Sequence, residues 1–348
     1  MRLLPPAQQG AILSDVEEFL RDNTVLRVKD FSVEIIDGRD EGMFSWLTLN
    51  YILGRLDLSP NTTTRFYDNV STVEHGSTVA TVDMGGASSQ VVFELDKKDG
   101  AWLPFTYFTP LKVYQSVSKN GNRRRRRPIY LYQHSYLGLG LNEARKRLLQ
   151  QLEEVKESAA KDPCFASRAG EEKVKACTAL FVRHVLQSRD ESVGDPKKSC
   201  THRSCGMQAV PQPVIQSDRM EVYVFSFFTD MIDRYCGDMC SKSTEFTVRT
   251  IDDGKTNMKV VPVSVYRRMA EKLCTETVYS LEDYLSASGD TPTTCLDVVY
   301  LYAYLSFGLE MKDTALVYVP EMVNGFSVAW PLGASLMQVN EMLDPTVE

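Results

Sequence analysis

The stretch that most constrains the fold is Thr81–Gln90, in which an acid and two adjacent glycines stand between two β-rich segments. Alternating, β-branched residues run from Ser77 to Asp83, and a second β-rich run extends from Ser89 to Leu95. A Walker loop or a dinucleotide-binding turn would need a helix after its glycines, and here a strand pattern follows. The sequence therefore predicts a hairpin closed by Gly85 and Gly86.

The composition of this hairpin suits phosphate. Glycine tolerates positive φ and lets backbone N–H groups point at an anion without a Cβ in the way. Asp83, at the end of the first strand, would hold a hydrated divalent cation, while Ser88 and Gln90 would orient a water for attack. An ordinary hairpin with a Gly-Gly turn explains the same residues, so both interpretations stay open.

A second group of polar residues, Asp40 and Glu41, lies between an expected strand over Phe31–Ile36 and an expected helix over Gly42–Leu56. The apolar stripe of that helix is formed by Trp46, Leu49 and Leu53. The pattern places both carboxylates near a helix N-terminus, where their ordinary role is capping. Near the end of the chain, Pro331 follows Trp330 at another expected helix start.

The order and spacing of these pieces resemble the nucleoside triphosphate diphosphohydrolase family, which includes apyrases, nucleoside-diphosphatases and guanosine-diphosphatase-like enzymes. The matching blocks are Met1–Leu4, Asp40–Gly54, Asp83–Gln90 and Trp330–Ala334, with further family landmarks at His134–Gly140, Phe225–Phe228 and Cys295–Tyr300. The resemblance spans the whole chain. The family's first conserved region, a second phosphate hairpin, has no counterpart, so we expect a member that begins later than its relatives.

The resemblance implies an α/β fold of the actin-like (RNase H-like), two-lobed ATPase type, with the first lobe incomplete. It implies that residues 1–36 and 321–348 are the remnant of the N-terminal lobe, with an exposed sheet edge and apolar face. Residues 37–320 would form the C-terminal lobe, with a disulfide-stapled, irregular insertion at 162–213.

The resemblance also implies hydrolysis of the terminal phosphoanhydride of nucleoside di- or triphosphates by water. Glu41 matches the family's catalytic base, and Ser88 and Gln90 match the residues that position the water. Backbone amides would bind the phosphate and stabilise its charge, and they belong to Gly85, Gly86, Ala87 and Ser88.

The same resemblance assigns a cation and a base contact. Asp83 and Glu41 would hold Ca²⁺ or Mg²⁺ through its waters, with Trp330 packed near those waters. Phe228, or else Phe227, would stack on the nucleotide base.

Eight cysteines lie in one part of the chain: Cys164, Cys177, Cys200, Cys205, Cys236, Cys240, Cys274 and Cys295. Their spacings lack zinc-knuckle pairs and fit disulfides formed in an oxidising compartment. Cys200–Cys205 resembles a family disulfide, the next expected pairs are Cys164–Cys177 and Cys274–Cys295, and Cys236–Cys240 remains. Glycosylation sequons at Asn61 and Asn69 agree with the secretory pathway, meaning the Golgi lumen, the cell surface or secretion.

A net charge of −7 over 348 residues gives the chain no general basic character for binding nucleic acid. The local exception is Arg123–Arg127, which predicts a solvated loop, with a processing site or an anion tether as alternatives. No apolar run is long enough to predict a transmembrane segment in this chain.

The other expected elements are helices over Ser14–Arg21, Asn142–Lys161, Ser264–Val278 and Asp297–Leu309, strands over Val222–Phe228 and Ala315–Pro320, and a closing helix at Pro331.

Two other functions compete with hydrolysis. The first is a catalytically impaired, nucleotide-binding remnant of the family, which only an assay separates from an active enzyme. The second is an exopolyphosphatase or sugar kinase with similar glycine hairpins. Trp46 and Asn50 after the acidic pair, together with the cysteines, favour the apyrase branch over this last alternative.

Overall fold

The structure is a computed structural model. It describes residues 1–25, 33–56, 78–116, 124–154, 164, 170–187, 203–242, 248–276 and 293–342. The sequons at Asn61 and Asn69 and the cysteine at position 200 lie outside the described residues.

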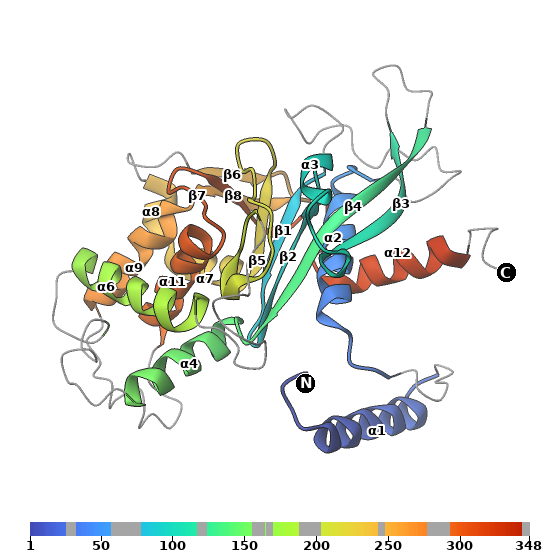
Figure 1. The fold of residues 1–348 in the computed structure, drawn as a ribbon, viewed down its shortest axis with the longest axis horizontal. Coiled ribbons are helices and arrows are strands. Elements are labelled where there is room, and N and C mark those ends of the chain that lie inside the picture. The colour runs from blue at the N-terminus through green and yellow to red at the C-terminus, as the bar shows by residue number, and fades with distance from the viewer. Residues whose placement is uncertain are drawn as a thin grey trace.

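One mixed sheet organises the described part of the chain, with strand order β3-β4-β2-β1-β5-β8-β7-β6 (Figure 1). Its strands are β1 Ala80–Met84, β2 Ser88–Glu94, β3 Phe108–Ser116, β4 Arg124–Leu137, β5 Val222–Ser226, β6 Arg249–Asp252, β7 Asn257–Pro262 and β8 Leu316–Met322. Strands β1 and β2 pair antiparallel, which confirms the expected hairpin, and β5 runs parallel to both β1 and β8.

Helices cover both faces of the sheet (Figure 1). The described helices are α1 Pro6–Asn23, α2 Gly38–Ile52, α3 Lys97–Gly100, α4 Leu141–Glu154, α6 Gly170–Phe181, α7 Phe227–Tyr235, α8 Gly237–Lys242, α9 Ser264–Glu276, α11 Thr294–Ala303 and α12 Trp330–Met342, of which α1 lies apart from the sheet (Figure 1). The largest apolar core lies between the sheet and the group that includes α4, α6, α7, α9 and α11. Burying this face removes the most apolar surface from water and gives the fold most of its hydrophobic stabilisation.

The opposite face of the sheet is covered by α2, on which α12 packs. Trp46 is fully buried, and its indole N–H donates to the Val79 carbonyl at 2.7 Å. The Asn50 amide oxygen accepts from the Val79 N–H at 2.8 Å, so two α2 side chains fix the backbone just before β1. The Thr48 hydroxyl donates to Ala329 and accepts from the Gly333 N–H, which anchors α12 on α2.

Three expectations for local structure are wrong. The strand expected over Phe31–Ile36 is absent in its described part, residues 33–36. This segment pairs with no described strand and leads directly into the Asp37 cap of α2. The arginines 124–127 begin β4 instead of lying in a loop, because β3 runs antiparallel beside them. The insertion at 162–213 contains α6 and a π-helical turn, so its described part is largely helical.

The boundaries of several expected elements also shift. Strand β5 ends at Ser226, and α7 begins directly after it, so Phe228 belongs to a helix and not to a strand. Strand β8 continues to Met322, across the expected lobe boundary at residue 320. The division of the chain into a lobe and a remnant remains a prediction.

Three of the four expected disulfides are present: Cys164–Cys177, Cys236–Cys240 and Cys274–Cys295. The last bond joins the end of α9 to the start of α11, and both of its cysteines are buried. Cys200 is outside the described residues, so its pairing with Cys205 stays a prediction.

Helix α1 buries none of its residues. None of the described helices is long and apolar enough to cross a membrane.

Candidate functional site

Strand register brings the polar residues of the hairpin into one row. Asp83 on β1 pairs with Gln90 on β2, and Gln90 pairs with Ser135 on β4. Side chains alternate between the two faces of a strand, and Val92, two residues after Gln90, packs in the core beneath α2. The three polar side chains therefore share the face of the sheet that α2 covers.

Helix α2 brings Glu41 to this row. The Asp37 carboxylate caps the helix by accepting from the Arg39 N–H at 2.7 Å, so Glu41 lies in the first turn. Gly42 follows it, and a Cβ there would lie 3.0 Å from the Gln90 Cβ, closer than side chains usually pack. A glycine at this point lets the helix approach the sheet and sets Glu41 beside Gln90.

The residues predicted to be catalytic meet directly. The Gln90 amide nitrogen lies 2.8 Å from the Ser88 hydroxyl oxygen, 3.2 Å from Glu41 Oε2 and 3.2 Å from the Ser135 hydroxyl oxygen. Ser88 and Gln90 are buried, whereas the Glu41 side chain is 23% exposed. Solvent can therefore reach the carboxylate while the groups around it are held in place.

Arg2 is a member of this cluster that charge and periodicity did not identify. One of its guanidinium nitrogens, Nη2, donates to Glu41 Oε2 at 2.5 Å and to the Ser88 hydroxyl at 2.9 Å. The other nitrogen, Nη1, reaches Ser135 at 3.4 Å. Arg2 and Gln90 thus both hold Oε2 of the carboxylate, and among the described residues Oε1 of Glu41 accepts no hydrogen bond.

The hairpin loop is held by hydrogen bonds from its backbone carbonyls to N–H groups at and just before the start of α4. The Gly85 carbonyl accepts from Leu141, the Gly86 carbonyl accepts from Asn142 and Glu143, and the Ala87 carbonyl accepts from Gly138, at 2.8 to 3.1 Å. With the carbonyls engaged on that side, no hydrogen bond within the described part of the chain occupies the N–H groups of Gly86 and Ala87. Free, preorganised amides at a glycine turn are what binding of a phosphate oxygen requires.

Asp83 lies at the end of β1, half-buried, and its carboxylate accepts from the Ser226 hydroxyl at 2.7 Å. Burial raises the pKa of Asp83 to about 6, the Ser226 hydrogen bond lowers it, and the negative charge of Glu41 raises it. The two carboxylates are therefore close enough to repel each other, and a positive charge nearby would relieve this repulsion.

These donors fit a hydrated divalent cation better than a directly caged one. In the described part of the chain, no three His, Cys, Asp or Glu side chains gather to hold a metal ion. Mg²⁺ in phosphate sites keeps several waters and takes one or two carboxylates plus phosphate oxygens. Asp83 and Glu41 can supply that contribution through waters. Trp330 is 37% exposed at the start of α12, and no described interaction joins it to either carboxylate.

The base-stacking role predicted for Phe228 is wrong. Its ring is completely buried and packs edge-on against Tyr266 and Tyr304, so it has no free face for a base. The cause is the turn at Ser226, which starts α7 and directs Phe228 into the main core. Phe227 is partly buried against the same core, and its role stays a prediction.

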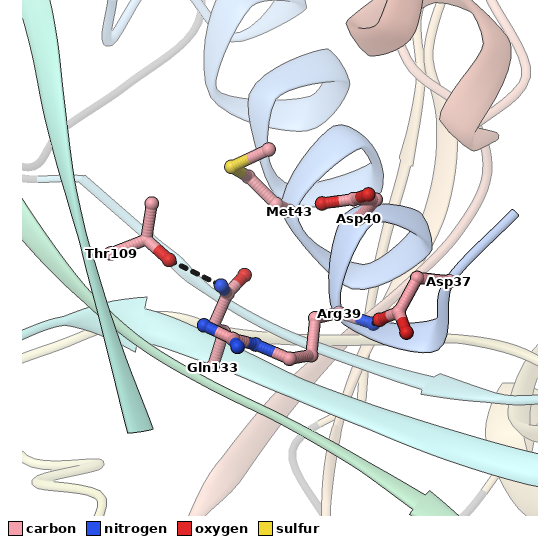
Figure 2. A pocket seen from close by; sticks show the side chains of 6 residues that line it. All are labelled: Asp37, Arg39, Asp40, Met43, Thr109 and Gln133. Atoms are coloured by element: carbon pink, nitrogen blue, oxygen red, sulfur yellow. Dashed lines mark hydrogen bonds between the residues drawn. The ribbon is translucent and has the colours of Figure 1, made fainter. Parts of the chain in front are cut away.

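A polar pocket of about 270 Å³ lies beside the cluster, between the first turn of α2 and strands β3 and β4. Figure 2 shows its lining residues, Asp37, Arg39, Asp40, Met43, Thr109 and Gln133. The Gln133 amide is hydrogen-bonded to the Thr109 hydroxyl, and Arg39 lies over it (Figure 2). Burial and the neighbouring Asp37 raise the pKa of Asp40. None of the residues predicted to be catalytic lines this pocket.

The contacts of Arg2, Ser135 and Ser226 were not predicted from the sequence. Each lies inside a block that resembles the family, so the blocks were the available signal. Each of the three residues contacts partners that are distant in the sequence, and local sequence patterns do not indicate which distant residues meet.

The fold and site define a class: an actin-like α/β protein with a glycine hairpin suited to phosphate. The chain matches a nucleoside triphosphate hydrolase from Neospora caninum with a TM-score of 0.54 at 12% identity, covering 98% of this chain and 71% of that one. The GDA1/CD39 (nucleoside phosphatase) family model matches residues 1–344. The chain belongs to this family.

Two curated relatives extend the comparison. A guanosine-diphosphatase of Schizosaccharomyces pombe is 30% identical over 98% of this chain and 59% of its own length. The human nucleoside diphosphate phosphatase ENTPD5 is 27% identical over 96% of this chain and 67% of its own length. The chain thus spans about three fifths of the length of the fission yeast relative.

Proposed function

We propose that the chain hydrolyses the terminal phosphoanhydride of nucleoside di- or triphosphates with a water activated at Glu41. The convergence of Glu41, Ser88 and Gln90 beside the glycine hairpin carries the proposal. Family membership and the names of the two relatives support the substrate class.

The chemistry follows from the contacts. Arg2 and Gln90 hold Oε2 of Glu41, so Oε1 is left to take a proton from water. The N–H groups of Gly86 and Ala87 stabilise charge on the transferred phosphoryl group. A divalent cation near Asp83 would neutralise phosphate charge. Glu41 lies on α2 and Gln90 on β2, and the turn that holds the Gly86 and Ala87 amides is fixed by its hydrogen bonds to residues 138–143, which favours a preorganised site.

The disulfides support a secretory location, because such bonds persist in oxidising compartments. We therefore propose that the chain meets its nucleotide in the secretory pathway or outside the cell.

A phosphate-release assay tests the function. The chain is incubated with guanosine, uridine and adenosine di- and triphosphates, with Ca²⁺, with Mg²⁺ or with a chelator. We expect release that requires the cation and stops on chelation. Nucleotide binding without release under all conditions would instead identify the nucleotide-binding remnant.

A further inference from the structure

Ser226 is a strained residue at the junction of a strand and a helix. It ends β5, has φ 61° and ψ −123°, and is followed at once by α7. Positive φ is rare for residues with a Cβ, and such strain gathers at functional sites. The side chain is exposed, so burial of the serine does not account for the strained backbone.

The position of Ser226 in the sheet is also informative. It pairs with Met84 in the parallel register of β1 and β5, so the carboxyl ends of both strands lie side by side. Ligands of open α/β sheets bind beyond the carboxyl ends of the strands. The glycine hairpin begins directly after Met84, which places Ser226 at the same end of the sheet as the phosphate-binding loop.

The third observation is a single strong contact. The Ser226 hydroxyl donates to Asp83 Oδ1 at 2.7 Å. Asp83 has no other described hydrogen bond through its side chain, so this contact sets the orientation of the carboxylate. A serine at φ 61° reaches across from β5 at the cost of backbone strain.

We propose that Ser226 is a positioning residue that orients the Asp83 carboxylate toward the waters of the divalent cation. The proposal rests on the proposed function, because that function assigns the cation to Asp83. Residues that orient metal ligands typically contribute 10- to 100-fold to metal affinity. Ser226 thus acts on the cation through Asp83 and does not touch the nucleotide.

The test is calorimetric titration of Ca²⁺ in the presence of a methylene-bridged nucleoside diphosphate, which cannot be hydrolysed. We expect Ser226→Ala and Ser226→Gly each to raise the Ca²⁺ dissociation constant about tenfold or more. Ser226→Gly relieves the strain, so its melting temperature should not fall below that of the wild type. Ser335→Ala is the matched control, because this exposed serine on α12 donates to the Pro331 carbonyl one turn away and makes no other hydrogen bond with a described residue.

A double-mutant cycle separates positioning from a direct role. In the Asp83→Asn background, adding Ser226→Ala should leave the Ca²⁺ dissociation constant unchanged. The inference is overturned if Ser226→Ala binds Ca²⁺ within twofold of the wild type, if its effect persists without Asp83, or if the wild type itself binds no Ca²⁺. Normal cation binding without phosphate release in the separate assay would refute the proposed function alone.

Discussion

Gly140 packs against the backbone of the phosphate hairpin, and replacing it by alanine perturbs that backbone without removing a predicted catalytic side chain. A Cβ on Gly140 would overlap backbone atoms of Ala87 and Ser88, and it would lie 2.5 Å from the Ala87 nitrogen. Ordinary van der Waals contact begins near 3.4 Å. Backbone atoms cannot rotate away as a flexible side chain can, so the loop must move by about 1 Å.

The size of the effect follows from that displacement. Misplacing groups at an active site by about 1 Å can lower the rate by roughly 10²-fold. Overpacking costs about 1 to 3 kcal/mol, which corresponds to a drop in melting temperature of about 2 to 6 °C. We expect Gly140→Ala to lower kcat/KM by roughly 10²-fold while the protein stays folded at 25 °C.

The assay is steady-state phosphate release together with thermal unfolding. Gly100→Ala is the matched control, since a Cβ at Gly100 meets nothing within 4 Å. If Gly140→Ala keeps kcat/KM within about threefold of the control, close packing behind the loop does not govern the position of its amides, and the reasoning fails.

Three further predictions concern charge, acidity and covalent stability. Arg2→Lys keeps the charge but loses the planar fork, so kcat should fall about tenfold with little change in KM, measured by steady-state kinetics. Burial and the charge of Arg39 lower the pKa of His134 from 6.5 to about 4, so protons bind the unfolded chain first and stability falls as pH drops below 6.5. Between pH 7 and pH 4.5, the free energy of unfolding in urea should therefore fall by about 2 kcal/mol less in His134→Phe than in the wild type. An equal fall in the two proteins would contradict the role of His134. The Cys274–Cys295 bond, with a sequence separation of 21, should appear in non-reducing peptide maps, and replacing both cysteines by alanine should cost roughly 3 kcal/mol in the same unfolding experiment.

Local chemistry made part of the site predictable. Glycines at a turn and alternating apolar residues fix the hairpin, and period-two alternation then puts Ser88 and Gln90 on the same face. A cap followed by an apolar stripe fixes α2, although the helix begins four residues before the expected start, at Gly38 instead of Gly42. Glu41 could be placed beside the hairpin only through the family resemblance, because no local pattern determines where α2 crosses the sheet.

The remaining features depend on contacts between distant residues. The apolar run Val222–Phe228 reads as one strand, and nothing in its composition signals the strained turn that ends β5 at Ser226. That turn decides that Phe228 points into the core. Five consecutive arginines resemble a solvated loop, and the pairing of residues 124–127 with β3 is set by backbone hydrogen bonds that their charge does not reveal.

The central claim is that Glu41 takes the proton from the attacking water. Single-turnover hydrolysis by Glu41→Gln, with nucleotide affinity measured in parallel by equilibrium binding, tests it most directly. The amide keeps the shape of the side chain and its place beside Gln90 but cannot accept the proton. We expect the substitution to lower the hydrolysis rate by roughly 10²-fold or more with nucleotide still bound. A variant that hydrolyses at a near-native rate would show that Glu41 only holds Arg2 and Gln90 in place and is not the base.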